Sequence, residues 1–170
     1  ITVSSATMAE YFASKGWNDI TIAFPANIRE KDLLKRISRK ARLNILVSSY
    51  EHVEYITGGF HFEAGCFIKV NTGYNRAGTD WNDYTSVTRM ITAINKTGCL
   101  RFRGFLTHAG HTYKANSRSE IADIYRDTLH KLNNLRDNSG SVKAILSVGD
   151  TPSCSVIDDF TGTDEIRPGN

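Results

Sequence analysis

Four short segments of the sequence combine glycine with side chains that can bind an anion or move a proton. They are residues 69–78 (KVNTGYNRAG), 107–113 (THAGHTY), 147–153 (SVGDTPS) and 165–170 (EIRPGN). In the first segment Arg76 stands between small residues, and its guanidinium can hold an anionic or phenolic oxygen by a charge-assisted hydrogen bond. The alternative is that Lys69 and Arg76 form ion pairs with acidic neighbours. The residue types leave both interpretations open.

The second segment contains two histidines, His108 and His111, on either side of a glycine. Two histidines at this spacing can bind one metal ion when both lie on a helix. This pair lies in a glycine-containing loop instead, and no third ligand stands at a recognised spacing. We therefore expect no metal site here. An imidazole of this loop can instead stack on, or donate to, a bound aromatic ligand, with Tyr113 contributing a hydroxyl. The remaining alternative is that both are ordinary loop histidines.

The third and fourth segments are suited to phosphate. Loops with serine and threonine hydroxyls beside a glycine hold phosphate through those hydroxyls and through backbone N–H groups, without a lysine. Residues 167–170 can complete such a site, because Gly169 allows a phosphate to approach the backbone closely. Two phosphate-suited loops after successive late strands match the usual phosphate position in (β/α)8 barrels.

The elements that would position these segments alternate regularly along the chain. Short β-rich runs are expected over residues 1–5, 19–24, 44–48, 66–71, 102–108 and 143–148, each followed by a helical period. Near-continuous apolar strands alternating with helices indicate an α/β fold with a parallel sheet covered by helices. A doubly wound sheet would concentrate its ligand at one switch point, whereas four polar loops after four strands favour a (β/α)8 barrel.

Capping patterns locate three of the helices. Asn27 with Glu30, Ser48 with Glu51, and Ser117 with Glu120 each have capping-box spacing. The longest helix is expected to follow Ser117. Its expected buried face consists of Ile121, Ile124, Tyr125, Leu129 and Leu132.

Charge and composition exclude several classes of protein. The net charge is +3, but residues 29–42 hold seven of the 21 basic residues and only two acidic ones, so the rest of the chain is slightly acidic. Leu33, Leu34, Ile37 and Ala41 form an apolar stripe through that segment, which indicates a solvated outer helix, and we expect no nucleic-acid binding. No apolar stretch is long enough to span a membrane, and three widely spaced cysteines indicate a reducing, cytoplasmic setting without disulfides.

Together, the four segments in this order resemble the D-serine dehydratase and D-threonine aldolase family of fold-type III pyridoxal-phosphate enzymes, which share the alanine-racemase barrel. The opening, residues 1–25, is similar to the second and third barrel strands of that family. The resemblance implies pyridoxal 5′-phosphate (PLP) at the barrel mouth. The implied cofactor-binding residues are Arg76 at the ring oxygen, His108 near the ring, Tyr113, Arg167 at the ring nitrogen, and Thr151, Gly169 and Asn170 at the phosphate. Arg76 and His108 are also the implied catalytic residues.

The same resemblance implies that residues 1–170 are a PLP-binding barrel domain that is incomplete at both ends. The lysine that bonds the cofactor would lie on a first strand before Ile1, and the metal ligands would lie in a β-domain after Asn170, so that no metal ligand is expected within the chain. Lys69 matches a barrel-wall lysine instead. Asn71 replaces an aspartate that is usual in the family, and Leu106 replaces a tyrosine, so these departures concern substrate choice.

The implied activity is that of a lyase on β-hydroxy D-amino acids that uses PLP and a divalent metal, zinc or manganese. Elimination of water and ammonia, as in D-serine dehydratase, is favoured by Asn170 in the final segment. Retro-aldol cleavage, as in D-threonine aldolase, is the first alternative. A non-catalytic barrel that carries PLP is an alternative from another class. The full-length protein is expected to be a homodimer.

Overall fold

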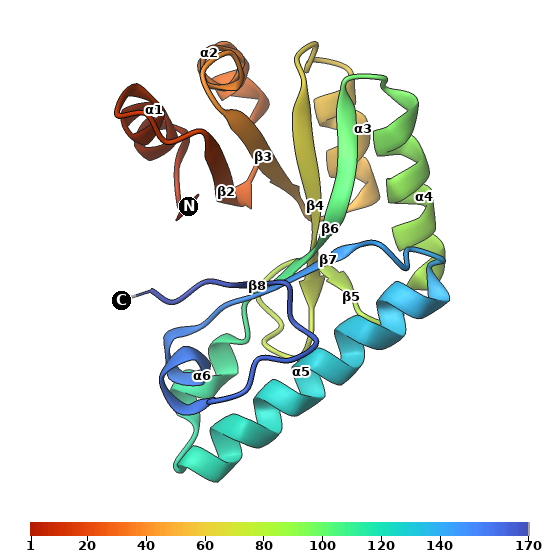
Figure 1. Cartoon of the computed structure of the whole chain (residues 1–170). Helices are drawn as coiled ribbons and strands as arrows, with labels where there is room; N and C mark the ends of the chain where they lie inside the picture. The colour runs from red at the N-terminus through yellow and green to blue at the C-terminus, as the bar shows by residue number, and fades with distance from the viewer. Residues whose placement is uncertain (170) are drawn as a thin grey trace.

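Seven parallel strands form one curled sheet in the computed structural model, which describes residues 1–169. The strands are β1 (Thr2–Val3), β2 (Asp19–Pro25), β3 (Arg42–Val47), β4 (Ala64–Asn71), β6 (Leu100–Thr107), β7 (Ile145–Val148) and β8 (Glu165–Ile166), hydrogen-bonded in that order. A short strand that was not expected, β5 (Thr79–Asp80), pairs with β4. The sheet curls into an open half-barrel (Figure 1), which confirms the predicted partial barrel of parallel strands.

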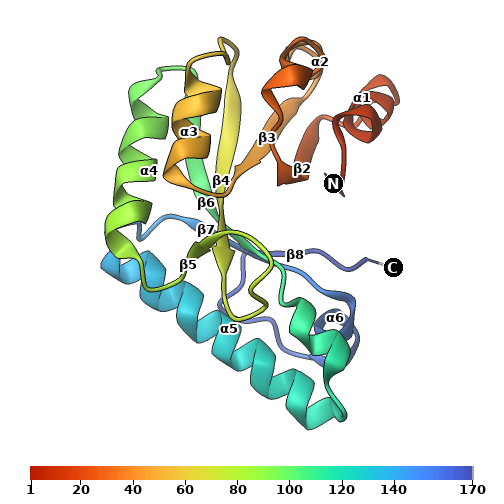
Figure 2. The ribbon, with the colours of Figure 1, turned by 180° about the vertical axis from the view of Figure 1, so that it is seen from behind.

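Helices follow the strands and cover the outer side of the sheet (Figures 1 and 2). They are α1 (Ala6–Ser14), α2 (Lys31–Ser38), α3 (Tyr50–Thr57), α4 (Tyr84–Lys96), α5 (Arg118–Asn138) and α6 (Thr151–Val156), with the 3-10 turns η1 (Ile28–Glu30) and η2 (Gly110–Lys114). Within residues 1–169, no helix combines the length and the apolar character needed to cross a membrane.

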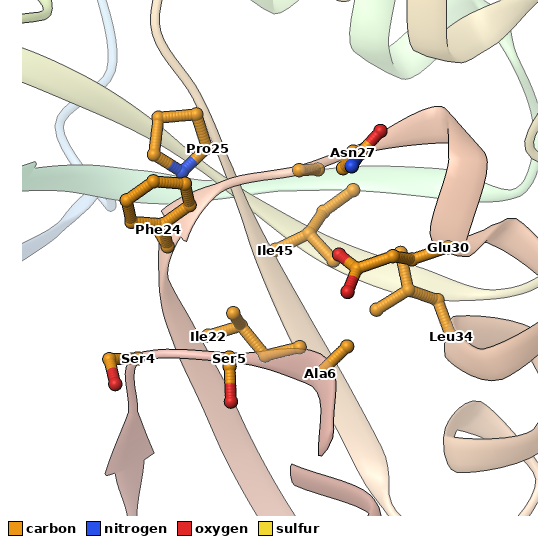
Figure 3. A pocket seen from close by; sticks show the side chains of 11 residues that line it. Ser4, Ser5, Ala6, Ile22, Phe24, Pro25, Asn27, Glu30, Leu34 and Ile45 are labelled. Atoms are coloured by element: carbon orange, nitrogen blue, oxygen red, sulfur yellow. The ribbon is translucent and has the colours of Figure 1, made fainter. Parts of the chain in front are cut away.

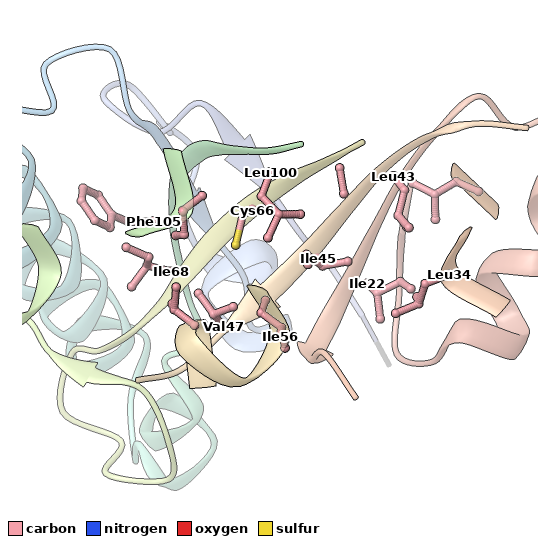
Figure 4. Packing of buried hydrophobic residues seen from close by; sticks show 14 of the residues in the cluster. Ile22, Leu34, Leu43, Ile45, Val47, Ile56, Cys66, Ile68, Leu100 and Phe105 are labelled. Carbon is pink, nitrogen blue, oxygen red and sulfur yellow. The ribbon is translucent and has the colours of Figure 1, made fainter. Parts of the chain in front are cut away.

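The strands are apolar on both faces because both faces are buried. In β3, Ile45 and Val47 face the helices as part of the main core (Figure 4), whereas Leu46 belongs to a second cluster. Phe67 of β4 and Leu106 of β6 join Leu46 in that cluster. Because side chains alternate between the faces of a strand, the second cluster fills the concave side of the curled sheet. In a sheet with one face in solvent, apolar and polar residues would alternate along each strand instead.

The structure corrects two of the three predicted helix starts. Ser117 caps α5 as expected, accepting a hydrogen bond from the Glu120 N–H at 3.1 Å. The cap of α3 is Ser49 rather than Ser48, since the Ser49 hydroxyl accepts from the next turn. Asn27 caps the 3-10 turn η1, and α2 begins only at Lys31. That turn takes up the capping residue, so α2 starts without a side-chain cap.

The buried face of α5 lies nearer its carboxyl end than predicted. Tyr125 and Leu132 are buried as expected, but the other fully buried residues of this helix are Thr128 and Leu135. The predicted Ile121, Ile124 and Leu129 are only partly buried. The first turns of α5 extend past the edge of the core, so their apolar side chains retain solvent contact. The stripe expected in residues 29–42 is confirmed for Leu34 and Ile37, which are buried, and for Leu33, which is partly buried. Ala41 is also buried, but α2 ends at Ser38, so Ala41 lies in the turn before β3 and the predicted helix is shorter than expected.

Candidate active site

The loops that follow β4, β6, β7 and β8 meet at the carboxyl ends of these strands, as the sequence predicted. The ring of Tyr74, from the loop after β4, lies 5.7 Å from the ring of His108, which follows β6. The Tyr113 hydroxyl accepts a hydrogen bond from the Thr151 N–H at 3.3 Å. The Thr151 hydroxyl in turn donates to the Gly169 carbonyl at 2.5 Å. Direct contacts therefore join the four segments.

An aromatic cluster fixes the first two loops against each other. Tyr74 stacks on His111 with ring centroids 6.4 Å apart and packs edge-on against His108. The Arg76 guanidinium lies 5.2 Å from the centroid of the Tyr74 ring, within the range of a cation–π contact. The ring of Tyr113 lies 6.1 Å from that of His108. Tyr74 was not among the predicted site residues, although its place between Gly73 and Arg76 in the first polar loop was a signal for it.

A hydrogen bond to the backbone gives His108 a defined tautomer, and its surroundings disfavour the charged imidazolium. Its Nδ1 lies 2.8 Å from the Gly149 carbonyl oxygen, which can only accept, so Nδ1 carries the hydrogen and Nε2 is the free acceptor. Burial lowers the pKa of His108, the hydrogen bond to Gly149 partly opposes this, and the charge of Arg76 lowers the pKa further. The Nε2 atom is therefore the ring position available to accept a proton or a hydrogen bond.

Three cations, Lys69, Arg76 and Arg167, lie near one another at the carboxyl ends of the strands, and within residues 1–169 none has a carboxylate partner. Lys69 is 6% exposed, and burial together with the charges of Arg76 and Arg167 lowers its pKa to about 8. None of the three takes part in an ion pair within residues 1–169. The interpretation that Lys69 and Arg76 pair with acidic neighbours is therefore wrong. Uncompensated positive charge in a partly buried site favours an anionic ligand.

Arg167 also locks the last strand to its neighbours. Its Nε donates to the Ser147 hydroxyl at 3.0 Å, and its Nη2 donates to the Ser147 carbonyl at 3.2 Å and to the Thr107 carbonyl. Burial lowers the pKa of Arg167 to about 10, so the guanidinium remains charged at neutral pH. A side chain at Gly149 would collide with Arg167, since a Cβ there would lie 2.6 Å from the Arg167 Cβ. Glycine at position 149 therefore allows this close approach of β7 and β8.

Asp150 connects the histidine loop to the expected phosphate segment, and sequence reasoning missed it. The side chain is 2% exposed, and its Oδ1 accepts from the Thr112 hydroxyl at 2.7 Å and from the Ser153 N–H at 2.8 Å. It thereby caps α6 and anchors η2 at once. The spacing of Asp150 and Ser153, with Pro152 between them, is a helix-start signal that could have revealed the cap. No sequence pattern indicates the bond to Thr112.

Open space adjoins the expected phosphate position. A Cβ on Gly169 would meet no atom closer than the Thr151 hydroxyl, at 3.8 Å. Gly169 also borders a hollow of about 950 Å³, which Arg167 and Pro168 line on one side and Thr2 and Thr21 on the other. The predicted Asn170 lies outside the described residues. Within residues 1–169, no three histidine, cysteine, aspartate or glutamate side chains gather as a metal site would require.

A second cavity, of about 260 Å³, lies between β2, β3 and the helices α1 and α2 (Figure 3). Its lining is mainly apolar and includes Ile22, Leu34 and Ile45. The hydroxyl of Ser5 already caps α1, and the amide of Asn27 already caps η1. The carboxylate of Glu30 also lines this cavity, so negative charge and apolar walls make it unsuited to a phosphate.

Known proteins share this arrangement of strands and loops. The family model "alanine racemase, N-terminal domain" matches residues 2–170. The chain belongs to this family. It is 27% identical to a D-serine dehydratase of Dictyostelium discoideum over 191 residues, covering 100% of this chain and 47% of that protein. It is 28% identical to a D-threo-3-hydroxyaspartate dehydratase of Delftia sp. over 190 residues, covering 99% of this chain and 46% of the relative.

Solved structures of family relatives have the same fold. The Delftia dehydratase superposes with a TM-score of 0.87 at 22% sequence identity, covering 99% of this chain and 46% of that one. A D-threonine aldolase from Filomicrobium marinum superposes with a TM-score of 0.86 at 17% identity, covering 99% of this chain and 47% of that one. The chain thus spans about half the length of the relatives it matches. Within the family fold, the four polar segments occupy the mouth of the barrel.

Replacing Asp150 by alanine is expected to lower the free energy of unfolding by about 2 kcal/mol, because the change removes a helix cap and a buried hydrogen bond together. Urea unfolding monitored by circular dichroism measures this. Asp83→Ala is the matched control, since Asp83 caps α4 with a single bond to the Ser86 N–H at 3.0 Å and is exposed. The control should cost about 1 kcal/mol. Equal losses in the two variants would show that the Thr112 contact adds nothing.

Proposed function

We propose that the chain forms the PLP-binding part of a lyase that removes water and ammonia from β-hydroxy D-amino acids, as the D-serine dehydratases do. The observation that carries this proposal is the gathering of His108 and three unpaired cations, Lys69, Arg76 and Arg167, beside the contact between Thr151 and Gly169. The names of the relatives support the choice of substrate class, since two are dehydratases of hydroxylated D-amino acids.

The residues present fit an anionic, phosphate-bearing aromatic cofactor. The unpaired cations supply complementary charge, and the Thr151 hydroxyl lies beside the open space at Gly169, where a phosphate could approach the backbone. The aromatic cluster of Tyr74, His108 and Tyr113 offers ring surfaces to a planar ligand. Asp150 adds negative charge nearby, but its Oδ1 is occupied by Thr112 and Ser153.

When bound, PLP supplies an electron-withdrawing ring that eases bond cleavage at the carbon bearing the substrate amine. In this proposal Arg76 orients the ring through its oxygen, and Thr151 with Gly169 holds the phosphate. His108 can take up or release a proton at Nε2, because the Gly149 carbonyl keeps the other hydrogen on Nδ1. Lys69 lines the wall between the two arginines without bonding the cofactor. A divalent metal, zinc or manganese, held by residues outside this chain would polarise the substrate hydroxyl.

Two other functions use the same residues. Retro-aldol cleavage is supported by the D-threonine aldolase with the same fold. A barrel that only carries PLP would need the phosphate-binding groups but no proton acceptor, and the defined tautomer of His108 favours an enzyme. The homodimeric assembly and the cytoplasmic location expected from the sequence belong to the proposal as well.

The test uses the protein expressed from its complete reading frame and purified with PLP and zinc or manganese. The expected result is formation of pyruvate and ammonia from D-serine, with L-serine unreactive. Glycine and acetaldehyde from D-threonine would instead establish the aldolase. Stoichiometric PLP without turnover of either substrate would establish the carrier. Absence of PLP binding would overturn all three.

A further inference from the structure

Basic side chains also gather at the opposite end of the half-barrel, where the strands begin. A depression of about 530 Å³ is lined there by Arg39, Lys40, Arg42, Arg101 and Arg103. Glu63 is the acidic residue in that lining. Arg42 opens β3, and the two other arginines that belong to strands lie near the start of β6. His108 follows the end of β6, so the depression is at the far end of the sheet from His108. The proposed function makes no use of these residues.

The protein leaves most of this charge uncompensated. Arg42 forms an ion pair with Asp19. Among residues 1–169, the other four cations form no ion pair, and Glu63 supplies the single carboxylate of the lining. Arg39 and Lys40 come from the basic segment 29–42, while the β6 arginines lie about 60 positions later in the chain. The fold therefore gathers charges that the sequence presents as separate.

Strand register places the basic residues of β6 on the concave side of the sheet. Asn44 of β3, Gly65 of β4 and Arg101 of β6 are consecutive lateral partners. The register of β6 shifts between Phe102 and Gly104, so Arg103 is placed by its contact instead: its Cγ lies over Gly65, on the same side as Arg101. Their neighbours Ile45 and Cys66 belong to the core beneath the helices, so this row points the other way, into the half-barrel.

The floor of the depression is built to hold Arg103 in place. A Cβ on Gly65 would lie 2.7 Å from the Arg103 Cγ and 2.1 Å from the Asn44 Oδ1, so both side chains pack directly over this glycine. Asn44 is 3% exposed and donates to the Asp19 carboxylate at 3.1 Å and to the Thr21 hydroxyl at 3.2 Å. The Arg103 Nε is buried and has no acceptor among residues 1–169. The described residues therefore hold this guanidinium in place but leave its Nε–H free for a ligand.

We propose that this depression binds a compact ligand carrying two or more phosphoryl groups. Guanidinium groups hold phosphate oxygens by paired, charge-assisted hydrogen bonds, and cations from two segments, 39–42 and 101–103, line a space that can admit a diphosphate. A nucleic acid fits less well, because the cations surround one hollow instead of lining an extended surface, and the chain outside residues 29–42 is slightly acidic.

Isothermal titration with inorganic pyrophosphate tests the proposal on the complete protein saturated with PLP, so that phosphate-binding groups at the mouth are occupied. We expect saturable binding at one site per chain that weakens as salt is raised. The double variant R101A/R103A should bind at least tenfold more weakly, and R101K/R103K should fall between the two. Arg118→Ala with Arg126→Ala, on the exposed face of α5, is the matched control and should bind like the wild type.

Circular dichroism shows whether each variant is folded, and R101Q/R103Q replaces the alanine pair if that pair does not fold. Wild-type affinity in the β6 variants, or no saturation in the wild type, would overturn the proposal. Loss of pyrophosphate binding in Thr151→Val would place the anion at the barrel mouth and overturn it too. Affinity for single-stranded oligonucleotides that rises with their length, and exceeds that for pyrophosphate, would show an extended nucleic-acid surface instead.

Discussion

Gly169→Val is expected to weaken PLP binding about 100-fold, which corresponds to about 2.7 kcal/mol, while the protein still folds. The reason is local. The Cβ would point into open space with only the Thr151 hydroxyl, 3.8 Å away, as a neighbour, so the protein itself does not require glycine there. A branched side chain would fill the space through which we propose that the phosphate reaches the backbone. Absorbance titration with PLP measures the affinity.

Gly58→Val is the control for a branched side chain at an unobstructed glycine. Gly58 also has an ordinary backbone conformation, and its Cβ would meet nothing closer than two carbonyl oxygens at 3.8 Å. It ends α3, on the outer side of the sheet, so its replacement should leave PLP affinity unchanged. If Gly169→Val is folded and binds PLP like the wild type, the phosphate site does not include Gly169. Equal weakening in both variants would point to a general loss of stability.

The sequence predicted a parallel sheet because the longer strands contain consecutive apolar residues, such as Ile45–Val47 and Cys66–Ile68, which is typical of a sheet buried on both faces. It also predicted that the polar loops converge, since parallel strands bring their carboxyl ends together. Local signals were less reliable at the helix starts. Asn27 has the sequence pattern of an α-helix cap, yet it caps the 3-10 turn η1. The pattern does not distinguish the two, because both kinds of helix can begin with the same capping residue.

What the sequence could not show depends on register between distant strands. The sequence of residues 29–42 predicts an outer helix with its basic face in solvent. Leu34 and Ile37 are buried on the opposite, apolar face, in agreement with that prediction. The sequence gives no sign that Arg103 packs over Gly65, because that contact follows from the pairing of β4 with β6. For the same reason, the bond from Thr112 to Asp150, across 38 positions, could not be predicted.

Arg76→Ala is expected to lower kcat about 100-fold while changing PLP affinity much less, as loss of one positioned charge donor at a reacting group typically does. Arg76 is held over the Tyr74 ring, where its charge can act on the cofactor ring, whereas the proposed phosphate contacts lie at Thr151 and Gly169. Arg76→Lys should restore activity only in part, because an ammonium lacks the planar fork. Steady-state kinetics with D-serine and PLP titration separate the two effects.

Arg89→Ala is the matched control, because Arg89 also covers a tyrosine ring, that of Tyr50, at 3.8 Å but on the helical side of the protein. Its loss should leave kcat unchanged. Wild-type turnover in Arg76→Ala would remove Arg76 from the site, and an equal loss in both variants would reduce its role to packing.

A pH-dependent readout distinguishes a charge effect of Arg76 from a purely structural one. Burial lowers the pKa of Lys69 to about 8, and the positive charge of Arg76 contributes to that lowering. Removing the charge in Arg76→Ala should therefore raise the pKa of Lys69, so that this lysine stays protonated to higher pH. Acetylation of Lys69 by a soluble anhydride, followed by mass spectrometry from pH 6 to 10 (about four units around the lysine's value), measures the shift, because only the neutral amine reacts.

Arg76→Lys keeps the charge and should leave the Lys69 profile near that of the wild type. If the profile in Arg76→Ala does not move, the two side chains are not electrostatically coupled, and the positive charge at the barrel mouth cannot act as one site for an anion.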